Sequence, residues 1–435
     1  MAGPGIRYHH LARVLAGDFD VTLAVPQGSS GLDTQDYSLL VYQDKRDAAL
    51  TGAIQHADVV VVPAIWVDQI VGLLSSTYVV IDGYDPFVAE SLALGRSSVS
   101  SLLETLTQAN LLGDFFICAS ERQRDWWLGL LEANGRVNPH TFADDASLRS
   151  LVDVVPYGLP TAKPQHSKRV VRGVWSGVDE GDRIILWGGG LWPWLDPLTA
   201  IRAVAEIWRQ RQDVRLIFPG TQHPAPWMEE IPTHFKAARH LAEENGLLNR
   251  AVFFGEWVPY TDWPNVLLES DLALTLHYDT LETRLAFRSR VLDYIWAGLP
   301  IVATKGDATS DLISDYGLGV VVDYQDVKMI ADVMLQLLDM PRGEFDEKFA
   351  AVRRKLEWEK AAQPLLDFCM HPRRAPDKVV LKEDLGSPFY LEQRRRLVKE
   401  REHWRSLVQE YERGWFIRFM RRIHHWRRII WKKTL

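Results

Sequence analysis

Short runs of β-branched and aliphatic residues alternate with segments of helical hydrophobic spacing along most of the chain. In the first part, the runs that predict strands lie at residues 20–25, 37–42, 58–62, 78–82, 115–119 and 152–155. After a passage rich in Pro, Gly and charge at residues 156–182, strands are predicted at residues 184–187, 214–218, 252–254, 272–276, 301–304 and 320–323. These runs are apolar almost throughout, as strands are when helices cover both faces of a parallel sheet. The pattern therefore predicts an α/β fold with two successive domains, residues 1–160 and 161–375, followed by a helical extension at residues 376–435.

Length and composition agree with two globular domains. A chain of 435 residues exceeds what one core usually organises, and 47% hydrophobic residues can form sizeable cores. The two cysteines, Cys118 and Cys369, are too few for a disulfide framework. No apolar stretch reaches the roughly 18 residues of a membrane span, and the start lacks a signal-peptide pattern. We therefore expect a protein of the reducing cytoplasm.

The beginning of the chain predicts a glycine loop, with Gly3 and Gly5, that leads directly into a helix at residues 6–16. A doubly wound domain normally opens with a strand before such a loop. We therefore expect that a first strand of about five or six residues is missing from the first domain.

A second glycine turn follows the predicted strand at residues 184–187. Gly188, Gly189 and Gly190 end this strand, and a helix is predicted from about Leu198. Bare backbone N–H groups at such a turn, together with a helix N-terminus, form a site for a diphosphate. The spacing is not that of G-x-G-x-x-G or of the P-loop, so a tight turn without a ligand is the alternative.

Two arginines mark the start of another predicted helix. If this helix begins near Phe287, Arg288 and Arg290 lie in its first turn, where the helix dipole favours acids. Cations at this place indicate a bound anion, and Asp293 follows about one and a half turns later. The alternative is a pair of surface arginines bonded to Glu282 or Asp293.

Several motifs together point to a known family. They are Gly3-Pro-Gly-Ile-Arg7, Val155-Pro-Tyr-Gly158, Gly255-Glu-Trp-Val258 and, most specifically, Asp293-Tyr-Ile-Trp-Ala-Gly-Leu-Pro300. The span from Gly3 to about Phe368 resembles the GT-B glycosyltransferases of the retaining family 4 type, the glycosyl transferases group 1. The resemblance implies two Rossmann-like domains facing each other across a cleft and a helix near residues 358–368 that crosses back. It also implies a nucleotide diphosphate sugar as co-substrate on the second domain, an acceptor on the first, and neither a cofactor nor a metal.

The chain departs from the family pattern at two places. The family usually has two glutamates eight positions apart; the second falls on Asp293, but the first falls on Leu285. The Arg and Lys that usually follow the Gly-rich strand are also missing. We expect Arg288 and Arg290 to supply the lost charge, and Glu282 or His277 to contact the donor sugar.

Acceptor-side residues are predicted at the end of the strand at residues 78–82. Open α/β sheets bind ligands at the carboxyl ends of their strands. Asp82 and Asp85 are therefore candidates for orienting the acceptor or acting as a base. A helix cap is an equal alternative for Asp85.

The extension has a charge pattern of its own. Residues 392–413 predict a charged helix, and residues 414–435 contain seven Arg or Lys and no acid, although the formal charge of the chain is −7. Their apolar and aromatic residues fall on one arc of a helix, which is typical of a basic amphipathic helix at an anionic membrane. Docking on the acidic remainder of the chain or on a partner is the alternative, and the acidic remainder argues against nucleic acid.

The sequence thus predicts a glycosyltransferase that moves a sugar from a nucleotide diphosphate sugar to a glycan or lipid-linked acceptor. Surface polysaccharide, lipopolysaccharide or glycolipid synthesis would be its pathway, at the inner face of the cytoplasmic membrane. Two alternatives are a nucleotide-sugar epimerase of the same fold and a catalytically degenerate protein that binds sugar nucleotides or glycans.

Overall fold

The computed structural model describes residues 3–29, 35–44, 46–74, 77–221, 233–380, 403, 404 and 406. The chain divides into two compact units, Met1–Ala375 and Pro376–Leu435. In the second unit the structure describes helix α18 (Pro376–Val380) and three further residues. The basic segment predicted at residues 414–435 lies outside the described residues, as does most of the charged segment at residues 392–413.

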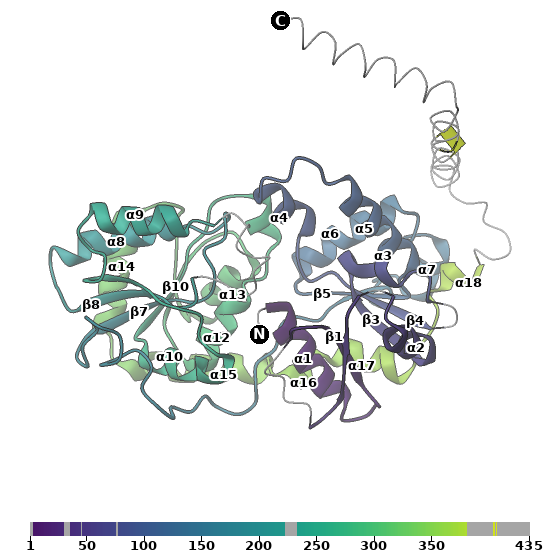
Figure 1. Cartoon of the computed structure of the whole chain (residues 1–435), viewed down its shortest axis with the longest axis horizontal. Coiled ribbons are helices and arrows are strands. Elements are labelled where there is room, and N and C mark those ends of the chain that lie inside the picture. Colours follow the sequence, from purple (N-terminus) through teal and green to yellow (C-terminus); the bar gives the residue numbers. More distant parts are fainter. Residues whose placement is uncertain are drawn as a thin grey trace, which may run out of the picture. The chain divides into compact units, whose positions relative to one another are not determined.

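The C-terminal half of the first unit contains a parallel six-stranded sheet in the order β12-β11-β10-β7-β8-β9. The strands are β7 (Arg183–Trp187), β8 (Val214–Phe218), β9 (Val252–Phe254), β10 (Leu272–Thr275), β11 (Ile301–Thr304) and β12 (Gly319–Val322). Helices α8 (Pro197–Trp208) and α9 (Phe235–Glu244) lie on one side of the sheet, and α10 (Trp263–Glu269) and α12 (Ser289–Ala297) on the other (Figure 1). Because helices cover both faces, the strand residues need to be apolar along their whole length.

The N-terminal half contains the remaining described strands in two parallel sheets. A four-stranded sheet has the order β3-β4-β5-β6, and β1 pairs with β2 in a separate sheet. The strands are β1 (Thr22–Pro26), β2 (Ser38–Tyr42), β3 (Val59–Pro63), β4 (Tyr78–Asp82), β5 (Phe115–Cys118) and β6 (Val152–Val154). Every run that the sequence marks as a strand is a strand, with ends displaced by about two residues at most, as is usual for boundaries. The additional strand expected ahead of the first helix stays a prediction.

Helices connect these strands in alternation. In the N-terminal half they are α1 (Gly3–Leu15), α2 (Ala48–His56), α3 (Val67–Ile70), α4 (Phe87–Ala93), α5 (Ser100–Leu112), α6 (Glu121–Ala133), α7 (Pro139–Asp144) and the 3₁₀ helix η1 (Ala64–Trp66). In the C-terminal half they include α11 (Leu281–Leu285), α13 (Ala308–Tyr316), α14 (Val327–Asp339) and the 3₁₀ helices η3 (Tyr260–Asp262) and η4 (Arg342–Phe345). Gly3 and Gly5 are helical, so the predicted glycine loop is wrong. The first turn of a helix accepts Pro4 and these glycines because its N–H groups have no acceptor within the helix.

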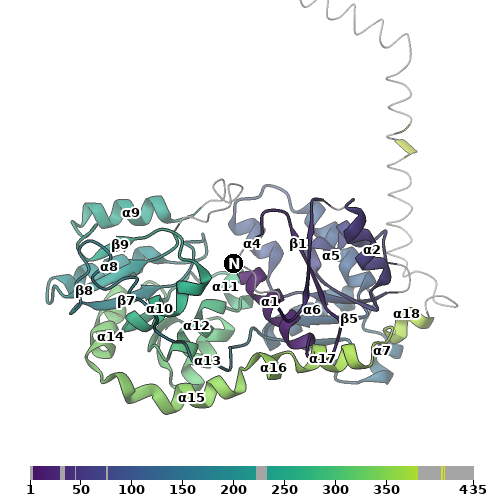
Figure 2. The same cartoon turned by 60° about the horizontal axis from the view of Figure 1, so that its bottom comes forward.

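The last helices of the unit return from the C-terminal half to the N-terminal half. Figure 2 shows α15 (Asp346–Lys355), α16 (Trp358–Ala361) and α17 (Gln363–Met370) in succession along one edge. The Phe368 ring stacks on Phe115 of β5 with centroids 4.9 Å apart, and Arg374 Nη1 lies 2.8 Å from Asp114 Oδ2. These contacts join the last helices to the N-terminal half, and the role of the segment as the family's crossing helix stays a prediction.

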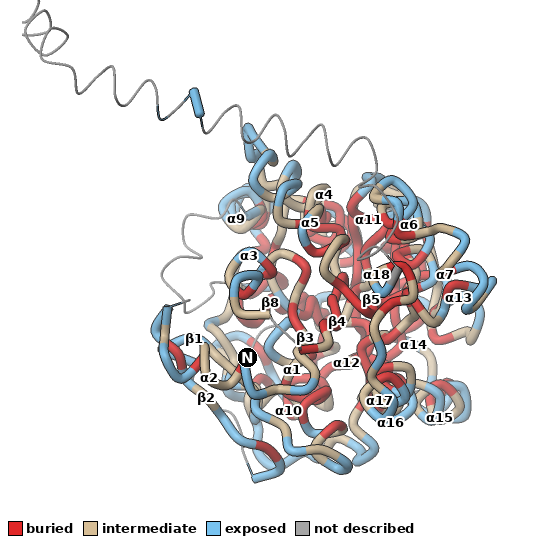
Figure 3. Tube along the Cα trace, turned by 90° about the vertical axis from the view of Figure 1, so that its right-hand side faces the viewer, coloured by how far each residue is buried: buried red, intermediate tan, exposed pale blue. Residues whose placement is uncertain are grey.

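A first buried ion pair joins α1 to β4. Figure 3 shows the buried residues along the strands and on the inner faces of the helices. Arg7 of α1 and Asp82 at the end of β4 are both fully buried, with Nε–Oδ2 at 2.7 Å and Nη2–Oδ1 at 3.0 Å. Burial alone would lower the pKa of Arg7, but Asp82 raises it above its ordinary value. The guanidinium also lies over the Tyr157 ring, 5.1 Å from its centroid. Asp82 is therefore tied to α1.

Replacing Arg7 by Met should destabilise the protein strongly. The change leaves the buried Asp82 carboxylate without its counter-ion, which typically costs about 3–5 kcal/mol of unfolding free energy. Urea unfolding would measure it. Arg13→Met is the matched control, because Arg13 belongs to the same helix but pairs with Asp36 at the surface, where an ion pair contributes little. Equal unfolding midpoints for the two variants would contradict this account.

Candidate active site

The strand order of the six-stranded sheet defines the position of the site. The chain proceeds from β7 to β8 and β9 on one side of the sheet, and β10, β11 and β12 lie on the other. β7 and β10 are neighbours, so the direction of winding changes between them. Open parallel sheets bind ligands at such a switch point, beyond the carboxyl ends of the strands. Gly188–Gly190 follow β7 and His277 follows β10, which brings two predicted segments to this point.

The three glycines after β7 differ in what they offer. The N–H of Gly188 donates to Tyr294 Oη at 2.8 Å, and this hydroxyl donates to the Leu274 carbonyl at 3.1 Å. The Gly188 N–H is therefore already used within the protein. Gly190 packs against the Trp192 ring, where an added Cβ would lie 3.0 Å from Nε1. Gly189 is exposed and adopts φ = 83°, a conformation that favours glycine. Gly189 therefore gives the accessible backbone of this turn.

Arg290, in the first turn of α12, lies beside that turn. A Cβ added to Gly189 would lie 3.4 Å from Arg290 Nη2, and the guanidinium lies 5.9 Å from the Trp187 ring centroid. Within the described part of the chain Arg290 forms no ion pair and no hydrogen bond, and its Nη1 is buried without a partner. Burial lowers the pKa of Arg290 to about 10, so the group is still a cation at neutral pH. A partly buried cation without a counter-ion in the described residues, next to an open glycine and a helix N-terminus, suits a bound anion.

Two more of the predicted donor residues, Gly3 and Gly5, lie at the start of α1. Gly3, at the start of α1, lies near the start of α12, because an added Cβ would be 3.9 Å from Ser289 Oγ. Gly5 is exposed in the first turns of α1. The two helix starts thus approach each other from the two halves of the unit.

Asp293 lies one turn further along α12. Its Oδ2 accepts a hydrogen bond from the Trp263 indole Nε1 at 2.9 Å. Burial raises the pKa of Asp293 to about 7, although Trp263 and Arg290 act in the opposite direction. The indole of Trp263 also approaches Gly188, so the carboxyl and the glycine turn share a neighbour.

Arg288, two residues before Arg290, is in a different situation. It precedes α12 as its N-cap residue and forms a two-pronged ion pair with Glu282 of α11, with both N–O distances at 2.8 Å. Both side chains are buried. The alternative in which Arg288 bonds to Glu282 is thus what the structure shows, although the pair lies inside the protein and not on its surface. Glu282 neutralises Arg288, which leaves Arg290 as the available charge.

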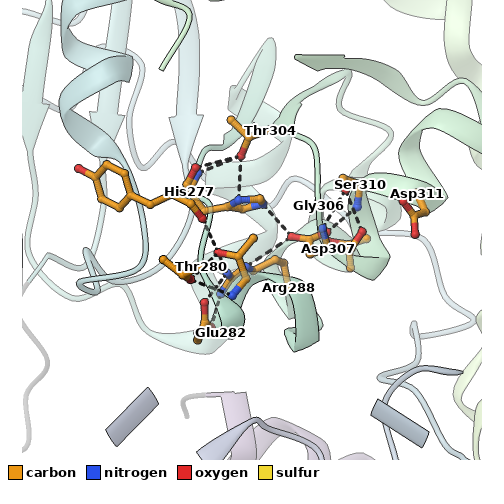
Figure 4. A network of polar contacts seen from close by, with 12 residues as sticks. His277, Thr280, Glu282, Arg288, Thr304, Gly306, Asp307, Ser310 and Asp311 are labelled. Atoms are coloured by element: carbon orange, nitrogen blue, oxygen red, sulfur yellow. Dashed lines mark hydrogen bonds and ion pairs between the residues drawn. The ribbon is translucent and has the colours of Figure 1, made fainter. Parts of the chain in front are cut away.

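His277 and Asp307 extend this ion pair into a network, shown in Figure 4. Asp307 caps α13, and its Oδ2 lies 2.9 Å from His277 Nε2 and 3.5 Å from Arg288 Nε. His277 Nδ1 lies 2.9 Å from Thr304 Oγ1. Burial lowers the pKa of His277 although Asp307 opposes this, so the ring is neutral at pH 7. Its Nδ1 is hydrogen-bonded to Thr304 and its Nε2 lies against the Asp307 carboxylate without a well-aligned hydrogen bond, and the contact of His277 with a sugar stays a prediction.

Two carboxyls of the N-terminal half face Glu282. α11 packs against α4 and α6, and Asp85 stands in the turn between β4 and α4, with Glu90 in the first turn of α4. Within the described residues neither carboxyl has a hydrogen bond or an ion pair. The N-cap of α4 is Pro86, so Asp85 does not cap this helix by its side chain.

The environment of these carboxyls changes their acidity. Burial, then Glu282 and Asp82, raises the pKa of Asp85 to about 7, while Arg7 and Arg288 act against this. Burial, then Asp85 and Glu282, raises the pKa of Glu90 well above its ordinary value. A carboxyl that titrates near pH 7 can give or take a proton under physiological conditions.

The structure therefore brings the predicted residues together in two groups. Gly189, Arg290 and Asp293 form the anion side. Glu282 and Asp85 form a carboxyl side, to which the structure adds Glu90. The sequence reasoning missed Glu90 and Asp307. Asp307 comes three residues after the strand at residues 301–304, near the carboxyl end of a parallel strand as Asp82 is, and this signal could have identified it.

The described residues offer no candidate for a metal site or a membrane-spanning helix. No group of three or more of their His, Cys, Asp or Glu side chains is placed to hold a metal ion. No helix in the described ranges is long and apolar enough to cross a bilayer.

A cavity of about 200 Å³ opens between the end of α4 and the turns near α8 and α9. Its lining residues are Ala93, Leu94, Gly95, Pro193, Thr233 and His234.

Comparison with known proteins agrees with this geometry. Residues 175–355 match the profile of the family glycosyl transferases group 1. None of the curated proteins matches the sequence. The solved structure of Anabaena HepE in complex with UDP and glucose has a TM-score of 0.65 at 15% identity, over 85% of this chain and 97% of its own.

Two further solved structures have the same architecture. WaaG, a glycosyltransferase involved in lipopolysaccharide biosynthesis, has a TM-score of 0.55 at 16% identity, over 85% of this chain and 97% of its own. Sucrose-phosphate synthase from Thermosynechococcus elongatus has a TM-score of 0.60 at 13% identity, over 85% and 93%. These likenesses confirm the predicted fold class, an α/β protein of the GT-B type with two Rossmann-like domains. Together with the matched segment they support the predicted enzyme class, a glycosyltransferase.

The raised pKa of Asp85 predicts how stability depends on pH. In the unfolded chain this carboxyl has its ordinary pKa of 3.8, so between about pH 4 and pH 7 the folded protein holds a proton that the unfolded chain has released. The free energy of unfolding should therefore fall as pH rises through this window. Asp85→Asn removes the effect, so the stability of the variant relative to the parent in urea unfolding should increase between about pH 4 and pH 7 and stay constant above that range.

Asp332→Asn is the control for this measurement, because Asp332 is an exposed carboxylate on α14 that pairs with Lys328. Its stability difference from the parent should not grow with pH in the same way. A difference that grows equally in both variants would exclude Asp85 as the cause.

Proposed function

We propose that the protein is a retaining glycosyltransferase of the family 4 type that transfers a sugar from a nucleotide diphosphate sugar to a glycan or lipid-linked acceptor. The observation that carries the proposal is Arg290, a partly buried cation without a counter-ion among the described residues, whose Nη1 is enclosed beside the exposed Gly189 turn. Burying such a charge is costly unless an anion neutralises it. A donor diphosphate would supply that anion.

The donor would bind at the switch point between β7 and β10. Arg290, the backbone of Gly189 and the first N–H groups of α12 would hold the diphosphate. Asp293 and Trp263 lie next to this position and would contact the nucleoside or the sugar. HepE, which has the same fold, was solved in complex with UDP and glucose, so UDP is a reasonable first probe.

The acceptor would lie on the carboxyl side of the site. When the new glycosidic bond forms, the acceptor hydroxyl loses its proton and the diphosphate leaves with the electron pair of the broken anomeric C–O bond. Arg290 would stabilise the charge that grows on the diphosphate. Asp85, with a pKa near 7, would take the proton. Asp82 is held by Arg7 and would position the turn that carries Asp85.

The unpaired carboxyls also favour particular acceptors. Asp85 and Glu90 have no cationic partner of their own among the described residues, and Glu282 is already paired with Arg288. An acceptor with a phosphate or carboxylate next to the reacting hydroxyl would find no free cationic partner among these groups. A neutral sugar or one with an amino group is compatible with these carboxyls.

We assign the protein to surface polysaccharide, lipopolysaccharide or glycolipid assembly at the inner face of the cytoplasmic membrane. The basic segment at residues 414–435 supports this assignment, because its Arg, Lys and Trp content suits an anionic surface. WaaG acts in lipopolysaccharide biosynthesis and has the same fold.

Arg290→Gln should weaken UDP binding about tenfold or more, because a charge-assisted hydrogen bond to phosphate is lost. Isothermal calorimetry with the full-length protein and UDP, GDP and ADP would measure this. Arg284→Gln is the matched control, because Arg284 is an exposed arginine at the last turn of α11. No heat with any of the three nucleotides, or equal affinity in Arg290→Gln, would remove the basis of the proposal.

Assays of donor turnover would separate the remaining alternatives. Release of nucleotide that depends on an acceptor indicates transfer, conversion of the donor without an acceptor indicates an epimerase, and binding without turnover indicates a binding protein.

Deletion of residues 414–435 should reduce sedimentation with liposomes of anionic phospholipid, because these residues carry seven basic side chains and no acid. Neutral liposomes give the reference. If both chains pellet equally with anionic liposomes, the segment is not a membrane anchor, and docking on the protein body or a partner is favoured.

A further inference from the structure

The side chain of Gln123, near the start of α6, connects the two halves of the first unit. It is 2% exposed. Its Nε2 donates to the Tyr84 carbonyl at 2.8 Å and to the Leu285 carbonyl at 2.9 Å, and its Oε1 accepts from the Ala119 N–H at 2.7 Å. Both amide hydrogens and the amide oxygen are therefore used. The geometry is that of a fixed spacer between two backbone segments.

The two segments that Gln123 joins belong to opposite sides of the site. Tyr84 directly precedes Asp85, the carboxyl proposed to take the acceptor proton. Leu285 ends α11, the helix that carries Glu282 and thereby holds Arg288. One buried amide thus fixes the backbone next to the acceptor-side carboxyl against the backbone next to the donor-side ion pair.

A second side chain of the same helix turn makes a similar connection. Arg122 donates to the Gly306 carbonyl and pairs with the Asp311 carboxylate, on either side of Asp307. Arg122 is partly exposed, whereas Gln123 is enclosed. The start of α6 therefore contacts Gly306 and Asp311, labelled in Figure 4, through Arg122, and the end of α11 through the buried Gln123.

We propose that Gln123 is a positioning residue that sets the spacing between Asp85 and the Glu282–Arg288 pair. The inference rests on the proposed function, because this spacing is also that between the acceptor hydroxyl and the donor. Amide hydrogen bonds are directional, and a buried carbonyl left without its donor is costly, so the two segments move apart when the amide is lost. A displacement of about 1 Å in a reacting pair can lower a rate up to 100-fold.

The charges around Asp85 give a readout that does not depend on turnover. The groups that face it are Asp82, Tyr84, Glu90, Tyr157, Glu282, Arg7 and Arg288. Of these, Glu282 and Arg288 lie across the connection that Gln123 makes. Since Glu282 contributes more to the raised pKa of Asp85 than Arg288 does to lowering it, separating the segments lowers this pKa.

Gln123→Met tests the proposal, since Met has a similar length and shape but no amide. In protein labelled with ¹³C at the aspartate carboxyls, the Asp85 signal, identified by its loss in Asp85→Asn, should titrate at lower pH in Gln123→Met. The affinity for UDP should stay within about twofold, because neither Arg290 nor Gly189 is changed, and kcat should fall about tenfold or more with the KM for the donor retained. Gln363→Met, an exposed glutamine of α17 bonded to Asp367, is the matched control and should leave all of these values unchanged.

Gln123→Asn provides a second variant, because it keeps the amide but is one methylene too short to reach both carbonyls. The same changes are expected, so a folding defect confined to one variant does not prevent the test. An Asp85 titration and a kcat like those of the parent, in a variant that is folded by its melting curve, overturn the proposal. If the parent protein binds no UDP and turns over no donor, the proposed function fails, and the Asp85 titration still decides the role of Gln123.

Discussion

A charged group that leaves water needs a partner of opposite charge, and this constraint separates the structural charges of the protein from those that can act on a ligand. Arg7 and Asp82 neutralise each other in the interior, as do Arg288 and Glu282. Arg290 has no such partner among the described residues, although it lies only two residues after Arg288, in the first turn of α12. The glycine turn beside it leaves room for an anion because a side chain is absent at Gly189.

The site also depends on pieces from both halves of the unit. The anion side belongs to the C-terminal sheet, whereas Asp85 and Glu90 come from the turn and helix after β4. An enzyme that joins two substrates needs them held in one geometry, and such positioning can account for a large part of its rate. The contacts of α6 with α11, and the return of α16 and α17 to the N-terminal half, keep these pieces in register.

At both places where the sequence departs from the family pattern, a nearby side chain carries the charge that the pattern would place there. Leu285 occupies the place of the first expected glutamate, and its side chain is buried while its carbonyl accepts from Gln123. The neighbouring Glu282 carries a carboxylate in the same short helix, but that carboxylate is committed to Arg288. The basic residues missing after the glycine turn have a counterpart in Arg290, which reaches the same turn from α12.

The sequence by itself indicated the strands, because short apolar runs of β-branched residues bounded by turns are typical of strands in a covered parallel sheet. It also placed the glycine turn after β7 and the arginines at the head of α12, which are local features of a few consecutive residues. It did not separate Arg288 from Arg290, or Asp82 from Asp85, since each pair consists of the same residue type within a few positions. The tertiary structure decided this, because Asp82 meets an arginine 75 residues earlier in the chain and Asp85 faces a glutamate from the other half. Pairing and burial depend on such distant neighbours, and the acidity and availability of each group depend on pairing and burial.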